Sequence, residues 1–159
     1  MPALYKRLPS GKLAYHEAWE SGGTIYDHWG EVGDEGETRE LPAMSRAGRT
    51  ELKTLLDQAR RDGFAELDLG QRLILEYPID GMGTADDVDK MGKLQYELNE
   101  ILGWTALGFC DGNSVGSGTM EVCCFVVDFE LAKSVIVKGL AGTAFASYSR
   151  IYDEDDPSA

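Results

Sequence analysis

The chain has 159 residues, of which 43% are hydrophobic and 27% charged, a composition typical of a folded globular protein. Its 28 Asp and Glu residues outnumber its 15 Lys and Arg residues, and the net charge of −13 argues against a nucleic-acid or anionic-lipid partner. Met1–Ser10 carries no apolar signal-peptide core, and no run approaches the ~18 apolar residues that a membrane-spanning helix needs.

Strand patterns come first along the chain. Alternating apolar and polar residues predict strands over Leu13–Trp19, Thr24–Val32 and Glu37–Leu41. The turn signals between them are Ser21-Gly22-Gly23 and Gly33-Asp34-Glu35-Gly36. Because turns this short join neighbouring strands, we expect an antiparallel meander.

A helix is expected after the meander, over Arg49–Arg61, because apolar residues recur there with helical spacing. This apolar stripe consists of Leu52, Leu55, Leu56 and Ala59. Gly63 follows at the position where a left-handed residue ends a helix. A short strand over Phe64–Leu69 would complete a first domain, residues 1–70.

A second domain is expected over residues 71–152, with an acidic tail at 153–159. Its predicted strands are Arg72–Pro78, Thr105–Cys110, Met120–Val127 and Ser147–Tyr152. One predicted helix, Ala85–Leu102, opens on Thr84 and Asp87 in a capping-box pattern, and the other follows the N-cap residue Asp128. The order β-α-β-β-α-β is that of a ferredoxin-like plait, in which two helices cover one face of an antiparallel sheet.

The segment His28-Trp29-Gly30-Glu31-Val32-Gly33 resembles the signature of WGR domains, small modules found in poly(ADP-ribose) polymerases and in various bacterial proteins. Its further matches are Gly36, Thr38, Tyr15, Trp19 and the closing turn Asp62-Gly63-Phe64. The resemblance covers roughly residues 3–70 and implies an antiparallel sheet packed on one helix. The predicted fold class is therefore α+β, a WGR-like sheet and helix followed by a ferredoxin-like half.

The chain departs from that signature at Glu31, where the family carries an arginine that, with the tryptophan, helps the polymerase members engage DNA ends. An arginine can clamp a phosphate through two hydrogen bonds, whereas a carboxylate repels it. We therefore predict that this acidic edge binds a basic protein. The predicted partner-binding residues are Asp27, Trp29, Glu31, Asp34, Glu35 and Glu37. Packing of Trp29 between sheet and helix is favoured over stacking on a partner.

No pattern for catalysis, metal binding or cofactor binding is complete in the sequence. His16 and His28 stand apart, and the neighbours Cys123-Cys124 would face opposite sides of a strand, so zinc-ligand spacing is missing. The glycine-rich segment Asp111–Gly118 lacks the lysine and the following helix of a phosphate loop, and Val115 stands where a calcium loop needs an oxygen ligand. We expect no catalytic residue, no metal and no cofactor.

The cysteines Cys110, Cys123 and Cys124 are odd in number and lack the spacing of a disulfide framework. We therefore expect reduced, buried thiols and a cytoplasmic location.

A nucleic-acid-associated function is the alternative to protein binding. Its candidate residues form a basic stripe on the first predicted helix: Arg49, Lys53 and Arg60. Acidic residues share that helix at Glu51 and Asp57, which favours a salt-bridged surface over a phosphate-binding one.

Together these patterns predict a non-catalytic, acidic binding module that inhibits or neutralises a basic partner protein, as immunity proteins do for bacterial toxins. The competing hypotheses are a WGR-type accessory protein of nucleic-acid processing and a plait that binds a small molecule beside Asp111–Gly118.

Overall fold

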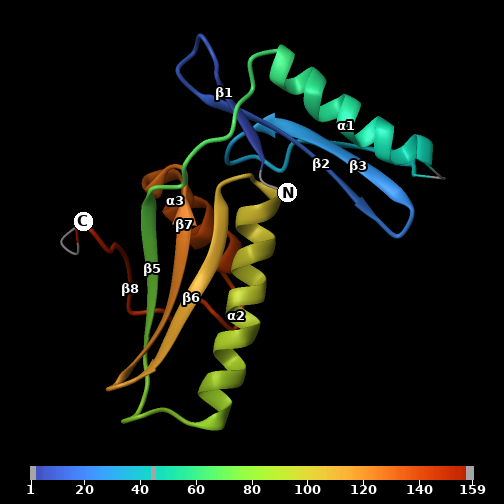
Figure 1. Ribbon diagram of the computed structural model, residues 1–159. Coiled ribbons are helices and arrows are strands. Elements are labelled where there is room, and N and C mark those ends of the chain that lie inside the picture. The colour runs from blue at the N-terminus through green and yellow to red at the C-terminus, as the bar shows by residue number, and fades with distance from the viewer. Residues whose placement is uncertain (1–2, 44–45, 157–159) are drawn as a thin grey trace. The chain divides into compact units, whose positions relative to one another are not determined.

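The computed structural model describes residues 3–43 and 46–156, with side chains of the first helix described from residue 50 onward (Figure 1). The chain divides into two compact units, residues 1–68 and residues 69–159. Both units pair an antiparallel sheet of four strands with helices, so the α+β fold class is confirmed.

The first unit is built on a sheet in which strands adjacent in sequence are adjacent in space, β1-β2-β3-β4. Its strands are β1 (Leu4–Arg7), β2 (Leu13–Ser21), β3 (Thr24–Glu31) and β4 (Glu37–Pro42). The predicted meander corresponds to β2, β3 and β4. Strand β1 was not among the predicted strands, and it pairs with β2 along its whole length.

Helix α1 (Arg46–Arg61) packs on this sheet and begins before the expected residue Arg49. The buried cluster between them contains Leu4, Ala18, Leu56 and Ala59. Gly63 ends the helix as predicted, with φ +90°, and Phe64 N donates to the Ala59 carbonyl. The strand expected at Phe64–Leu69 is wrong, because only an isolated bridge between Ala65 and Tyr5 forms there.

The second unit has the predicted β-α-β-β-α-β order, and its antiparallel sheet has the strand order β6-β7-β5-β8. Its elements are β5 (Gln71–Pro78), α2 (Ala85–Trp104), β6 (Gly108–Gly116), β7 (Thr119–Val126), α3 (Phe129–Leu140) and β8 (Arg150–Asp153). Helix α2 packs against β6 and β7, and α3 packs against β5. On the face of β7 that the helices cover, every second side chain is fully buried: Met120, Val122, Cys124 and Val126.

Both predicted helix starts of this unit are confirmed. The Thr84 hydroxyl accepts from Asp87 N at 3.3 Å, and the Asp87 carboxylate accepts from Thr84 N at 2.8 Å, which completes the capping box. Two hydrogen bonds to the Asp87 carboxylate, from the Thr84 hydroxyl at 2.7 Å and then from Thr84 N, lower the pKa of the Asp87 carboxyl. Asp128 caps α3 by accepting from Leu131 N at 3.0 Å.

The glycine-rich segment is strand rather than loop over most of its length. Strand β6 continues to Gly116, and the hairpin turn is confined to Ser117 and Gly118, which both have positive φ. A register shift between Cys110 and Asn113 marks a β-bulge, which accommodates one extra residue on β6. The predicted end of this strand at Cys110 was therefore wrong.

The expectation of three reduced thiols is also wrong. Cys110 and Cys124 lie directly opposite each other on β6 and β7 and form a disulfide. Cys123 is the free cysteine, and burial raises the pKa of its thiol. Reduced thiols were one reason to predict a cytoplasmic location, and that location stays a prediction.

Candidate partner-binding surface

Residues Glu31–Glu37, here called the acidic loop, leave β3 and fold back to begin β4. A buried tyrosine fixes the loop backbone, since the Tyr15 hydroxyl donates to the Glu35 carbonyl at 2.9 Å. The Nε2 atom of the fully buried His28 contacts the same carbonyl at 2.5 Å. Two side chains of the sheet therefore hold one peptide group of the acidic loop.

A carboxylate supports this clamp from the opposite side of the imidazole ring. Glu17 lies directly across from His28 in the β2–β3 register, and its Oε1 atom accepts a hydrogen bond from His28 Nδ1 at 2.8 Å. Burial, and then the nearby Glu17 carboxylate, raise the pKa of Tyr15. Tyr15 therefore keeps its proton and remains a hydrogen-bond donor to the loop at neutral pH.

Two glycines make room for this arrangement. Gly36 has φ +67°, and a Cβ atom there would overlap the Tyr15 hydroxyl and the Trp29 carbonyl. A Cβ atom on Gly30 would lie 2.8 Å from Gly36 Cα, closer than side-chain carbons approach one another in proteins. The glycine of the Trp-Gly pair thus has a packing role, because the loop crosses directly over it.

The acidic side chains on this clamped backbone point to solvent. Asp34, Glu35 and Glu37 are exposed, while Glu31 is partly exposed and forms an ion pair with Lys12 at 2.8 Å. The hydrogen bond to Glu31 raises the pKa of Lys12, so the Lys12 ammonium stays charged at neutral pH. An exposed pair of this kind contributes little to stability.

Asp27 does not belong to this surface, which corrects the predicted set. Its side chain is buried on the face covered by α1, since it lies opposite Ala18 of the helix-packed cluster. Its carboxylate accepts from His16 Nε2 and from Arg39, each at 2.6 Å. The role of Asp27 is to join three strands of the sheet rather than to meet a partner.

Replacing Asp27 by Asn should lower the stability of the first unit by about 1–3 kcal/mol, the cost of breaking a charge-assisted hydrogen-bond pair. The loss stays at that level because the Arg39 side chain is 53% exposed and water can solvate it once unpaired. Urea denaturation measures the loss. The exposed Glu40 of β4 supplies the control, and Glu40→Gln should change stability by less than about 0.5 kcal/mol. Equal effects would contradict the role given to Asp27.

Trp29, the remaining member of the predicted set, is partly buried. Its ring lies edge-on to His16, which in turn lies edge-on to Phe64 after α1. Trp29 thus continues the aromatic packing near the end of α1 and keeps some surface beside Glu37, its neighbour across the β3–β4 pair.

The basic stripe proposed for nucleic acid is largely neutralised. Lys53 and Arg60 flank Asp57 at 3.6 and 3.5 Å, and Arg60 also reaches Glu66 at 3.7 Å. The side chain of Arg49 lies outside the described residues. The described part of the stripe is the salt-bridged surface that the acidic neighbours predicted.

Among the described residues, no group of three His, Cys, Asp or Glu side chains is arranged to hold a metal ion. In the same part of the chain, no helix combines the length and the apolar character that crossing a membrane requires.

Comparison of the chain with protein-family models, with curated proteins and with solved structures found no match. The resemblance to WGR domains accordingly depends on the sequence motif alone.

Proposed function

We propose that this chain is a non-catalytic binding protein that neutralises a basic partner protein, with the acidic loop as its contact surface. The observation that carries the proposal is the clamp beneath the loop. The buried side chains of Tyr15 and His28 form hydrogen bonds with the loop backbone at the Glu35 carbonyl. The side chains of Asp34, Glu35 and Glu37 stay exposed. A surface ordered before binding loses less conformational entropy when the partner arrives.

Charge supports the same proposal. The net charge of −13 attracts a basic protein over distances comparable to the ~8 Å Debye length at physiological salt, and it repels the phosphates of nucleic acid. The WGR-like motif then serves as a scaffold for protein recognition, with Glu31 where the family has its arginine. Binding of blunt or nicked DNA duplex at micromolar concentration and physiological salt would favour the accessory-protein alternative.

Neutralising the loop tests the contact surface. In Asp34→Asn/Glu35→Gln/Glu37→Gln, association with a partner captured from native cells should slow by about tenfold, because steering charges act mainly on the association rate. Stopped-flow measurements over a range of salt concentrations give the rate. The salt dependence should be weaker than in the unmodified protein, and the free energy of unfolding should change by less than about 1 kcal/mol.

A second triple variant distinguishes the effect of the acidic loop from the effect of total charge. Glu20→Gln/Glu51→Gln/Asp68→Asn removes the same number of exposed acids from the first unit but leaves the acidic loop intact. Its association rate should stay within about twofold of the unmodified protein. Equal slowing in both triples, or capture of no basic protein, would overturn the acidic loop as the contact surface.

A further inference from the structure

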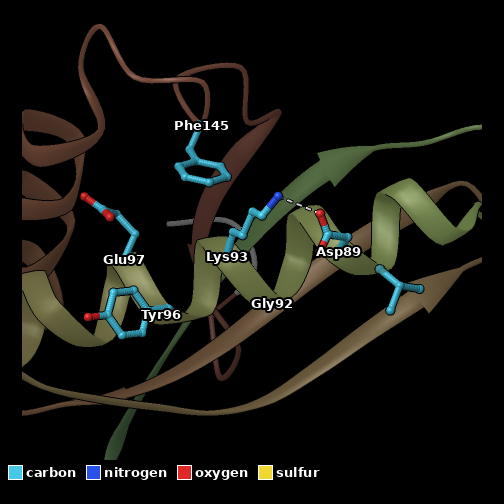
Figure 2. A pocket seen from close by; sticks show the side chains of 7 residues that line it. Asp89, Gly92, Lys93, Tyr96, Glu97 and Phe145 are labelled. Atoms are coloured by element: carbon cyan, nitrogen blue, oxygen red, sulfur yellow. Dashed lines mark hydrogen bonds and ion pairs between the residues drawn. The ribbon is translucent and has the colours of Figure 1, made fainter.

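A groove runs along the outer side of α2 in the second unit, with a volume of about 580 Å³ (Figure 2). Its lining residues are Val88, Asp89, Gly92, Lys93, Tyr96, Glu97 and Phe145. Figure 2 shows Phe145 descending from the segment after α3 toward the helix turn that carries Lys93. One wall is therefore the helix, and the other is an aromatic ring from a different part of the unit.

The helix wall carries an apolar stripe where a solvent-facing helix is normally polar. Val88, Gly92 and Tyr96 follow one another at intervals of four residues, and the exposed fractions of Val88 and Tyr96 are 52% and 66%. The same helix already buries Leu94 and Leu98 against its own sheet. The stripe is thus a second apolar face that the unit does not use for its core.

Gly92 forms a notch in the middle of this stripe. A glycine inside a helix costs about 1 kcal/mol relative to alanine. Packing within the chain gives no reason for it, since a Cβ atom at Gly92 would meet no atom within 4 Å. The missing side chain leaves space for a side chain from another molecule between Val88 and Tyr96.

The aromatic wall is fixed in place before any ligand arrives. The buried Tyr77 donates its hydroxyl hydrogen to the Phe145 carbonyl at 2.6 Å. The Phe145 amide donates to the Thr143 hydroxyl oxygen at 3.1 Å, and that hydroxyl donates to the Leu140 carbonyl at the end of α3. Hydrogen bonds on both sides of Phe145 therefore preform the groove.

The rim of the groove is acidic. Helix α2 carries five acids and two lysines, and both lysines are engaged within the chain. Lys93 pairs with Asp89 at 2.7 Å, and Lys90 lies 4.6 Å from the centre of the Tyr77 ring. Glu97 in the groove and Glu100 one turn later remain to meet cations.

We infer that this groove binds a basic amphipathic helix of a partner protein, with an aliphatic side chain over Gly92 and Lys or Arg side chains beside Glu97 and Glu100. From Val88 to Tyr96 the stripe spans roughly 12 Å, enough for two successive turns of a bound helix. The site lies wholly in the second unit and does not depend on the acidic loop.

Synthetic peptides test the inference directly. The probe is a fluorescein-labelled helical peptide of Leu, Ala and Lys, with Leu on one face and Lys on the other. Two controls keep its pattern but replace every Lys by Glu or every Leu by Ser. Fluorescence anisotropy should detect binding of the Leu/Lys peptide and of neither control. Amide chemical-shift changes in the ¹⁵N-labelled protein should centre on residues 88–97 and on Phe145.

Two glycines of α2 provide a matched pair of variants. Gly92→Leu fills the notch and should weaken peptide binding by about tenfold or more, as removal of an interface anchor pocket does. A Cβ atom at Gly103 also meets no atom within 4 Å, but Gly103 lies outside the groove. Gly103→Leu should therefore leave the affinity within about twofold.

Further variants keep the test decisive. If Gly92→Leu fails to fold, Tyr96→Ser replaces it, since Tyr96 is exposed and its loss should weaken peptide binding without unfolding. The acidic-loop triple should bind the peptide like the unmodified protein, which separates this inference from the proposed function. Equal binding of the Glu peptide, unchanged affinity in Gly92→Leu and Tyr96→Ser, or shift changes centred elsewhere would each overturn the inference.

Discussion

Gly36→Ala should destabilise the first unit by about 2–4 kcal/mol, whereas Gly22→Ala should cost about 1 kcal/mol. Both glycines have a left-handed backbone, with φ +67° and +59°. They differ in their surroundings, because a Cβ atom at Gly36 would overlap the Tyr15 hydroxyl and the Trp29 carbonyl, and one at Gly22 would meet no atom within 4 Å. The difference between the variants therefore measures the close approach beneath the acidic loop.

Urea denaturation followed by tryptophan fluorescence gives both values, since Trp19 and Trp29 lie in the first unit. Hydrogen exchange at the Val32–Gly36 amides should become faster in Gly36→Ala and stay unchanged in Gly22→Ala. Equal losses of stability in the two variants would mean that only the backbone conformation matters. The clamp by Tyr15 and His28 would then be wrong.

Cys110→Ala/Cys124→Ala should lower the stability of the second unit by about 3 kcal/mol, because the disulfide closes a loop whose ends are 14 residues apart. Cys123→Ala removes a neighbouring cysteine that belongs to no disulfide, and it should cost less than about 1 kcal/mol. Thermal unfolding with and without dithiothreitol measures the difference. The reductant should lower the midpoint of the unmodified protein and leave that of the double variant unchanged.

Thiol titration of the unfolded, unreduced protein supplies an independent check. One reactive thiol, from Cys123, is expected before reduction and three after it. Three thiols before reduction would contradict the disulfide and restore the reduced state that the spacing of the cysteines predicted.

Most of the fold could be predicted because local patterns determine it. The capping box at Thr84, the cap at Asp128 and the stop at Gly63 each involve residues close in sequence. Strand β1 was missed because four residues offer too short an alternation to distinguish from a loop. The predicted end of β6 was too early because glycines usually mark turns, whereas Gly112 and Gly116 lie within the strand. Their φ values of +146° and +149° belong to a backbone region that glycine adopts and other residues rarely do.

The candidate site could be predicted only in part. Asp34, Glu35 and Glu37 are exposed, as the acidic pattern predicts. Asp27 differs from them because side chains alternate between the two faces of a strand, and this alternation places Asp27 on the face covered by the helix. The pairing of Glu17 with His28 could have been predicted from the sequence. A two-residue turn at Gly22-Gly23 fixes the register of β2 and β3, and in that register Glu17 lies directly across from His28.

The contact of Tyr15 with the Glu35 carbonyl could not be predicted in the same way. It depends on how the acidic loop folds back across the sheet, and no local sequence pattern specifies that path.

The alternation of side chains along β7 also determines the thiol chemistry of the protein. Cys124 points into the fully buried, helix-covered layer with its partner Cys110, whereas Cys123 points to the opposite face of the same strand. Disulfide exchange requires a thiolate to attack a sulfur atom directly, and burial keeps the Cys123 thiol protonated. A free thiol and a disulfide can therefore occupy consecutive residues without scrambling for as long as β7 stays paired on both sides.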